Sequence, residues 1–238
     1  MNSPDFSALD TAGLNLQAVF ELTALPPALR QRLTAQTDPA PRYRQLILIG
    51  NAGPALWRAV SAAGLRGPDP IDDFSVHHVL RWFAEHCPGA ALHRLYPGSA
   101  PVDLQALGRL AGWHHDSPLR IGIQPGWGTW FAYRVALLAD TALPPSVPLN
   151  APSPCDACPD TPCIDACPAA AMADGRFALE RCLAYRQQPA SRCEHTCVAR
   201  LRCPVGASQR YPDAHIHHVY RHSLAMIVRH RQPPSADD

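Results

Sequence analysis

The sequence predicts an α+β protein in two parts, a helix-and-strand N-terminal domain followed by a small cysteine-rich module. Eight of the nine cysteines lie between Cys155 and Cys203, whereas residues 1–141 alternate short apolar segments with amphipathic ones. Between the two parts, five prolines stand in twelve residues, and proline continues neither a helix nor a central strand. We therefore expect an N-terminal domain over 1–142, a linker over 143–154, a module over 155–230 and a disordered tail over 231–238.

Hydrophobic periodicity predicts the individual elements. Apolar residues recur at helical spacing over 55–65, 72–86, 102–113 and 214–228, and the segments 14–25 and 46–49 look extended. β-branched and aromatic residues flank the turn-forming Pro125-Gly126-Trp127-Gly128. This pattern predicts a hairpin with strands over 120–123 and 129–139.

The composition excludes several function classes. All 21 basic residues are arginine, so no lysine can serve a Walker A phosphate site, a Schiff base or a general base. The 21 basic and 20 acidic residues nearly cancel and form no block of like charge, so we expect no nucleic-acid partner. The N-terminal segment lacks the apolar core of a signal peptide, and no apolar run reaches the roughly 18 residues of a membrane span. We therefore expect a cytoplasmic protein with no membrane partner.

The cysteines fall into two arrays with the spacing of iron–sulfur ligands. The arrays are Cys155-x2-Cys158-x4-Cys163-x3-Cys167-Pro and Cys182-x10-Cys193-x3-Cys197-x5-Cys203-Pro. Two-cluster bacterial ferredoxins use C-x2-C-x2-C-x3-C-P, in which the fourth cysteine ligates the other cluster. Cytosolic thiols are kept reduced, which favours metal binding over disulfides. The eight cysteines are therefore candidate metal ligands for two 4Fe-4S clusters.

A crossed arrangement like that of the ferredoxins predicts which cysteines share a cluster. The expected sets are Cys155, Cys158, Cys163 and Cys203 for one cluster, and Cys167, Cys182, Cys193 and Cys197 for the other. Pro168 suits the first turn of a helix, so we expect a helix directly after Cys167. The alternative is a pair of four-cysteine zinc sites, which favour paired C-x2-4-C motifs. Only Cys155/Cys158 and Cys193/Cys197 have that form.

Two families resemble parts of the chain. Cys182-Leu183-Ala184-Tyr185 resembles the cysteine segment of epoxyqueuosine reductases, which join a cobalamin-binding domain to a two-cluster ferredoxin module. Residues 69–79 and 120–138 resemble the CblC-type cobalamin-processing (MMACHC) family. This second resemblance implies a nitroreductase-like domain that binds a base-off corrinoid. It also implies a cofactor site at Gly128, Trp130, Phe131 and Arg134. A flavin is the alternative cofactor, since related folds bind FMN.

Together these features predict an iron–sulfur redox protein that takes electrons from a donor protein and passes them to a corrinoid. Such a protein would be an oxidoreductase of the cobalamin reductase type. The alternative is a ferredoxin-like electron carrier that docks a partner enzyme and binds no corrinoid. Cys87 is expected to be a small buried thiol, and the histidines His215, His218 and His222 to form a solvated or interface face of a helix. No catalytic residue and no oligomeric state follow from the sequence.

Overall fold

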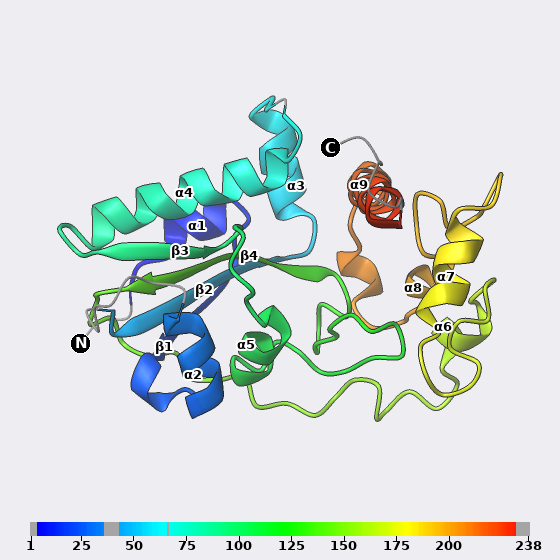
Figure 1. The fold of residues 1–238 in the computed structure, drawn as a ribbon, viewed down its shortest axis with the longest axis horizontal. Coiled ribbons are helices and arrows are strands. Elements are labelled where there is room, and N and C mark those ends of the chain that lie inside the picture. Colours follow the sequence, from blue (N-terminus) through cyan, green and yellow to red (C-terminus); the bar gives the residue numbers. More distant parts are fainter. Residues whose placement is uncertain (1–3, 36–42, 66, 232–238) are drawn as a thin grey trace, which may run out of the picture. The chain divides into compact units, whose positions relative to one another are not determined.

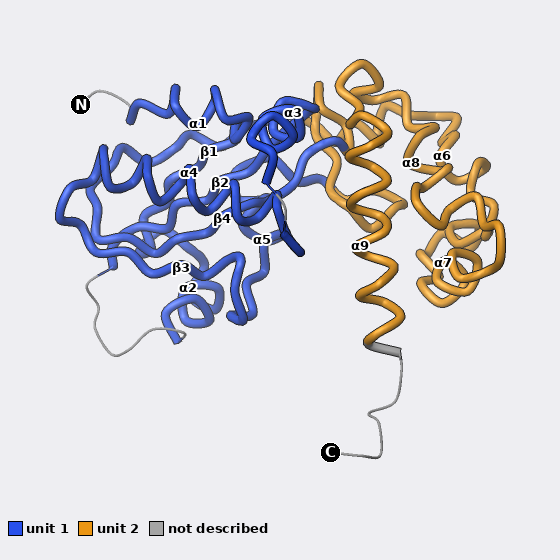
Figure 2. Tube along the Cα trace, turned by 90° about the horizontal axis from the view of Figure 1, so that it is seen from above, with its two compact units in different colours: residues 1–115, 130–151 blue, residues 116–129, 152–238 orange. Residues whose placement is uncertain are grey.

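The computed structural model describes residues 4–35, 43–65 and 67–231, which form two compact units. Figure 2 colours them blue for the first unit (residues 1–115 and 130–151) and orange for the second (116–129 and 152–238). The expected disordered tail falls outside the described residues from position 232 onward.

A four-stranded antiparallel sheet forms the centre of the first unit (Figure 1). Its strand order is β1 (Leu16–Glu21), β2 (Gln45–Ala52), β4 (Phe131–Ala139) and β3 (Leu92–Tyr96). Every residue of the central strand β2 is buried, as expected for a strand covered on both faces. This sheet confirms the α+β class in its coarse form, a mixed structure with an antiparallel sheet.

Helices cover both faces of this sheet. Figure 1 shows α1 (Ser7–Thr11) and α4 (Pro70–His86) on one face, and α2 (Pro27–Thr34) and α5 (Leu104–Leu110) on the other, with α3 (Ala55–Ala62) against α4. A short 3-10 helix, η1 (Leu22–Ala24), follows β1. Two acidic residues, Asp72 and Asp73, lie in the first turn of α4. Their negative charges interact favourably with the positive end of the helix dipole and stabilise the helix. On the buried side of α4, the Trp82 ring stacks on Phe6 with centroids 4.8 Å apart.

The second unit consists of short helices joined by loops. They are α6 (Pro162–Asp165), α7 (Leu179–Arg186), α8 (Val198–Leu201), the 3-10 helix η2 (Ala207–Gln209) and the long α9 (Asp213–Arg231). No helix among the described residues combines the length and the apolar character that a membrane crossing requires.

Periodicity located most elements correctly. The helical segments 55–65, 72–86, 102–113 and 214–228 correspond to α3, α4, α5 and α9, and the extended segments to β1 and β2. The expected hairpin is wrong in its first strand, because Arg120 takes a left-handed φ of 58° and residues 120–123 form no strand. An isolated bridge between Gln124 and Gly128 closes the turn instead.

The expected helix after Cys167 is also wrong. Residues 168–178 form turns, and Ala170 has a φ of 48°, which a continuous helix does not allow. The helix of this region begins earlier, with Pro162 in the first turn of α6. Pro162, directly before Cys163, thus takes the place at a helix start that was expected of Pro168.

The two compact units differ from the expected division at two places. Residues 116–129 belong to the cysteine-rich unit, because the turn at 124–128 packs against the backbone that follows Cys203. The expected linker forms no helix or strand, yet its first part lies beside the edge strand β1. There the Ser146 N–H donates to the Val19 carbonyl (2.9 Å), and the Val19 N–H donates to Ser146 Oγ (3.0 Å).

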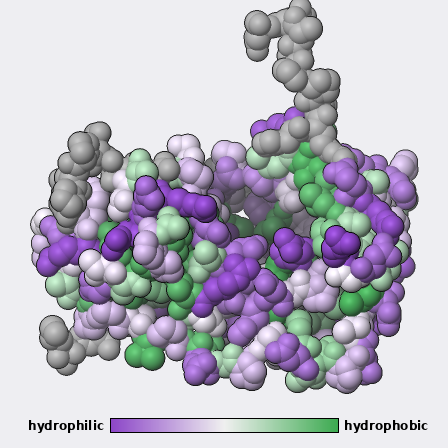
Figure 3. Space-filling model, turned by 60° about the horizontal axis from the view of Figure 1, so that its bottom comes forward, coloured by the Kyte–Doolittle hydropathy of each residue, from purple (hydrophilic) through white to green (hydrophobic). Residues whose placement is uncertain are grey.

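The surface carries scattered apolar side chains. Val147 is 92% exposed and Leu179 is 54% exposed. On the face drawn in Figure 3, hydrophilic and hydrophobic residues are interspersed. Isolated exposed apolar residues are normal in globular proteins and call for no partner by themselves.

Candidate metal centre

The structure brings the eight cysteines of residues 155–203 together in two groups of four. We call them the Cys155 group (Cys155, Cys158, Cys163 and Cys203) and the Cys167 group (Cys167, Cys182, Cys193 and Cys197). Each group takes three cysteines from one array and one from the other. Members of a group are close enough for the charge of one thiolate to act on the next.

Burial and mutual repulsion make these thiols hard to ionise together. Burial raises the pKa of five of them, and the charges of neighbouring cysteines in the same group raise it further. Thiolates are the form that binds metals, and a bound cation removes this repulsion. The donor set therefore fits a positively charged centre in each group.

The Cys155 group is built on the loop before α6 and on the chain after α8. Thr161, at φ 37°, turns the chain into α6, whose first turn carries Cys163. Cys203 comes from the other array. The chain that follows Cys203 packs tightly against the turn at 124–128. A Cβ added at Gly128 would lie 2.0 Å from the Val205 carbonyl oxygen, and one at Gly206 would lie 2.3 Å from the Trp127 carbonyl carbon.

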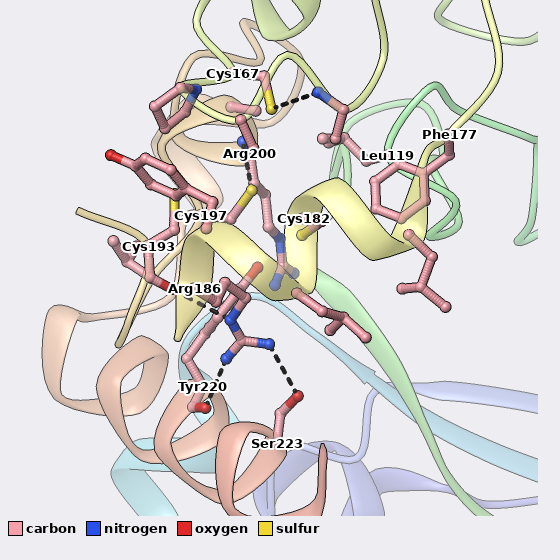
Figure 4. Close-up of a pocket in the computed structure, with 18 of the residues that line it drawn as sticks. Leu119, Cys167, Phe177, Cys182, Arg186, Cys193, Cys197, Arg200, Tyr220 and Ser223 are labelled. Carbon is pink, nitrogen blue, oxygen red and sulfur yellow. Dashed lines mark hydrogen bonds between the residues drawn. The ribbon is translucent and has the colours of Figure 1, made fainter. Parts of the chain in front are cut away.

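The Cys167 group surrounds one cavity, shown in Figure 4. Cys182 lies on α7, and Cys197 caps α8, where its Sγ accepts the Arg200 N–H at 3.4 Å. The Sγ of Cys167 accepts the Ala171 N–H at 3.5 Å. Backbone N–H donors of this kind stabilise negative charge on sulfur and tune the potential of a bound cluster.

This cavity has a volume of about 370 Å³, within the range of small-ligand sites. Its apolar lining includes Leu119, Ile121, Phe177, Leu179, Leu183 and Ile227. Its polar lining includes Tyr220, whose pKa burial raises to about 12, so the phenol stays neutral at physiological pH. Two arginines, Arg186 and Arg200, complete the lining.

The two arginines have different partners. Arg200 bonds to the end of the loop 116–129, because its Nε donates to Thr129 Oγ1 at 3.2 Å and its Nη2 donates to the Thr129 carbonyl. Its guanidinium also lies over the Tyr211 ring, 5.5 Å from the centroid. Arg186 is buried and donates to groups from α9 and from the chain around Cys193. Sequence analysis missed both arginines, although Arg186 follows Cys182 by four residues and so shares its face of α7.

The four residues expected at a cofactor fall in different surroundings. Gly128 belongs to the second unit, whereas Trp130, Phe131 and Arg134 belong to the first. Trp130 is fully buried, and Phe131 is buried edge-on to Tyr133 with centroids 5.9 Å apart. Both aromatic side chains are thus core residues here. Their assignment to a cofactor stays a prediction.

Arg134 is held by two residues from other elements of the first unit. Its Nε donates to Asn51 Oδ1 at 2.7 Å, and its Nη1 lies 3.8 Å from Asp72 Oδ1. Asn51 comes from the buried strand β2 and Asp72 from the first turn of α4. The guanidinium is therefore fixed between the sheet and a helix within the first unit.

The remaining candidates do not gather into a site. Burial raises the pKa of the Cys87 thiol, which makes it less reactive. His215 is buried under the Tyr211 ring, 4.2 Å between centroids, whereas His222 is exposed, so the expected histidine face is not uniformly solvated. Among the described residues, no three His, Cys, Asp or Glu side chains lie close enough together to bind one metal ion. This holds for the two cysteine groups as well.

Comparisons with known proteins identify the fold and not a family. No family model matches the sequence, and no curated protein matches it. An epoxyqueuosine reductase, solved with an epoxyqueuosine-modified tRNA-Tyr stem loop, aligns with a TM-score of 0.56 and 15% identity over 90% of this chain and 67% of that one. The catabolic reductive dehalogenase NpRdhA aligns with a TM-score of 0.53 and 13% identity over 91% of this chain and 34% of that one.

These similarities show that the chain shares its fold with two kinds of reductase. The chain spans about two thirds of the length of the epoxyqueuosine reductases that it matches, 66% and 67% for two of them. The C. elegans B12-trafficking protein CblC aligns over 91% of this chain and 92% of that one, with 12% identity and a TM-score of 0.47. A TM-score below 0.5 does not establish a shared fold.

Proposed function

We propose that this chain is an iron–sulfur redox protein that binds two 4Fe-4S clusters, one at the Cys155 group and one at the Cys167 group. The grouping itself carries this proposal. Cys203 lies with the first array and Cys167 with the second, which is how two-cluster ferredoxins share their ligands. A zinc site would combine two C-x2-4-C pairs, whereas Cys155/Cys158 and Cys193/Cys197 lie in different groups.

The surroundings of the cysteines also fit clusters. In a 4Fe-4S cluster each thiolate binds a different iron atom, so the four sulfurs lie further apart than the ligands of one ion. The N–H donors to Cys167 and Cys197 and the apolar lining of the cavity are the features through which a protein tunes such a centre. When bound, the clusters would supply one-electron transfer.

Anaerobic reconstitution of the full chain tests this proposal. We expect a brown protein with about eight iron and eight sulfide ions per chain. The variant Cys203→Ala should lose about half of the iron, and the matched control Cys87→Ala should lose none, because Cys87 lies outside both groups. A colourless protein that binds zinc, or a Cys203→Ala variant with full iron and sulfide content, would contradict the proposal.

We further propose that electrons from a donor protein pass to a corrinoid bound by the first unit, near Trp130, Phe131 and Arg134, with Gly128 at the adjoining turn. The resemblance of residues 120–138 to CblC-type proteins supports this step. Reduction of corrinoid cobalt needs a low potential, which iron–sulfur clusters can reach. The burial of Trp130 favours the second candidate, an electron carrier that docks a partner enzyme and binds no corrinoid.

An anaerobic titration with hydroxocobalamin separates these two candidates. If the first is right, stoichiometric protein produces a base-off visible spectrum, and after a low-potential reductant is added, cobalt is reduced faster than in the Cys203→Ala variant. Arg134→Ala should weaken binding without changing the iron content, whereas Arg94→Ala on the exposed side of β3 should do neither. If cobalamin stays free in solution, the electron-carrier function is the better proposal. The absence of a nucleic-acid partner also stays a prediction, which a binding assay with a tRNA stem loop tests.

A further inference from the structure

We propose that Arg186 is the internal counter-charge of the cluster bound by the Cys167 group and keeps its reduction potential higher than it would be without the guanidinium. This inference rests on the proposed function, since it concerns a cluster at those four cysteines. It assigns a role to a residue that belongs to neither cysteine array.

Arg186 carries a buried charge whose partners are all neutral. The side chain belongs to a residue that is only 7% exposed. Its Nε donates to the Cys193 carbonyl at 3.2 Å, and its Nη2 donates to the Tyr220 carbonyl at 2.9 Å and to the Glu194 carbonyl at 3.5 Å. Its Nη1 donates to Ser223 Oγ at 3.3 Å.

No carboxylate forms an ion pair with this guanidinium in the part of the chain that the structure describes. Hydrogen bonds to neutral oxygens satisfy the donors of a guanidinium but leave its charge in place. A buried cation is costly unless an anion lies nearby. The location of Arg186 therefore points to a negative group in its surroundings.

The Cys167 group is where that negative group would lie. Cys182 precedes Arg186 by one turn on the same face of α7, and the Cys193 carbonyl accepts a hydrogen bond from Arg186. Figure 4 shows the guanidinium among the residues that line the same cavity as these cysteines. A 4Fe-4S core with four thiolates has a net negative charge, and reduction by one electron adds another. The apolar lining limits screening, so a fixed positive charge there stabilises the reduced form more than the oxidised form.

The other polar groups in the cavity do not confuse the test. Tyr220 is neutral, and Arg200 is anchored at Thr129, so its charge stays in place in every Arg186 variant. Arg181 immediately precedes Cys182 but is 54% exposed and pairs with Asp174 at 2.9 Å. Arg181 is therefore a matched control, since it offers the same charge on the same helix in contact with solvent and already neutralised.

An EPR-monitored redox titration of the reconstituted full chain tests the inference. In Arg186→Gln we expect the reduction equilibrium constant of one cluster to fall about tenfold, which for a one-electron couple is about 59 mV. Arg186→Lys keeps the charge and should stay close to the parent protein. Arg181→Gln should leave both potentials unchanged. The signal of the cluster at the Cys155 group is an internal reference in every sample.

Two results would overturn the inference. One is an Arg186→Gln protein with full iron content and an unchanged potential. The other is an Arg186→Lys protein that loses the cluster or shifts its potential as much as Arg186→Gln, which would show that shape and hydrogen bonds matter rather than charge. If Arg186→Gln cannot hold the cluster and Arg186→Lys holds it at the parent potential, the inference is supported. If the parent protein itself forms no cluster, the proposed function fails and the inference falls with it, a result visible before any variant is made.

Discussion

Replacing Gly128 with alanine tests whether this glycine serves packing within the cysteine-rich unit. Gly128 has a φ of 60°, and a Cβ there would lie 2.0 Å from the Val205 carbonyl oxygen, well inside the 3.4 Å at which ordinary contact begins. Gly126, two residues earlier in the same turn, has a φ of 80° but nothing within 4 Å of an added Cβ. The two positions share the backbone cost and differ in the overlap.

The expected magnitudes follow from these two contributions. A left-handed backbone costs an alanine roughly 1–2 kcal/mol, and both variants bear this cost. The overlap at Gly128 adds about 1–3 kcal/mol, because backbone atoms must move to relieve it. Gly128→Ala should therefore lower the free energy of unfolding by about 2–5 kcal/mol and Gly126→Ala by about 1–2 kcal/mol.

Urea denaturation of the cluster-free protein under reducing conditions measures both values. Iron retention after reconstitution provides a second readout, because Gly128 packs against the chain that follows Cys203. The reasoning is refuted if the two variants unfold within about 0.5 kcal/mol of each other, the usual scatter of surface substitutions. A Gly128→Ala protein that is as stable as Gly126→Ala but binds cobalamin less tightly would instead favour the predicted cofactor role.

Three further predictions concern the sheet, one histidine and the isolated cysteine. Leu48→Ala in the fully buried strand β2 should cost about 2–5 kcal/mol in urea denaturation, and a cost below about 1 kcal/mol would contradict the assigned core. Burial lowers the pKa of His78 on α4, so acid must destabilise the fold as it protonates this ring below about pH 6.5. His78→Gln should therefore flatten the loss of stability on acidification, and an unchanged pH profile would argue against this. The Cys87 thiol should react with a thiol reagent more slowly than the Cys158 thiol of the cluster-free protein, because Cys87 is buried and Cys158 is partly exposed, as timed labelling and mass spectrometry would show.

Periodicity predicted those elements whose apolar pattern matches their burial. The segments 55–65 and 72–86 became helices because their apolar residues recur along one side, and 46–49 became a central strand because all its residues are apolar. Residues 120–123 have the composition of a strand, but Arg120 turns the chain into a left-handed conformation there. A local turn holds this conformation, because the Arg120 N–H donates to the Ser117 carbonyl (3.0 Å) and Ser117 Oγ donates to the Ile121 carbonyl (2.7 Å).

The cysteine spacing predicted which cysteines lie together, since the structure brings together the two sets that the ferredoxin pattern implies. That these sets bind clusters stays a prediction. Arg186 could not be recognised from composition or motif, because its importance lies in the absence of a neighbouring carboxylate among the described residues of the fold. Its spacing of four residues from Cys182 is the only signal that the sequence offers, and on an exposed helix the same spacing would carry no meaning.

The segment 116–129 makes the cysteine-rich unit discontinuous in sequence, and this has a testable consequence. Leu119 and Ile121 line the cavity of the Cys167 group, and Thr129 receives two hydrogen bonds from Arg200. A fragment of residues 152–238 lacks this wall and this anchor. It should therefore release iron to a chelator faster than the full chain, with the greater change at the Cys167 group.

A synthetic peptide of residues 116–129 provides the control for this fragment. If the segment contributes through packing, adding the peptide should slow the release of iron, and a peptide with Thr129 replaced by valine and Gly128 by alanine should not. Equal rates for the fragment and the full chain would show that the cysteine-rich module is complete from residue 152 onward. The contacts of Leu119, Ile121 and Thr129 would then be incidental to metal binding, and the expected boundary at the proline-rich linker would be the functional one.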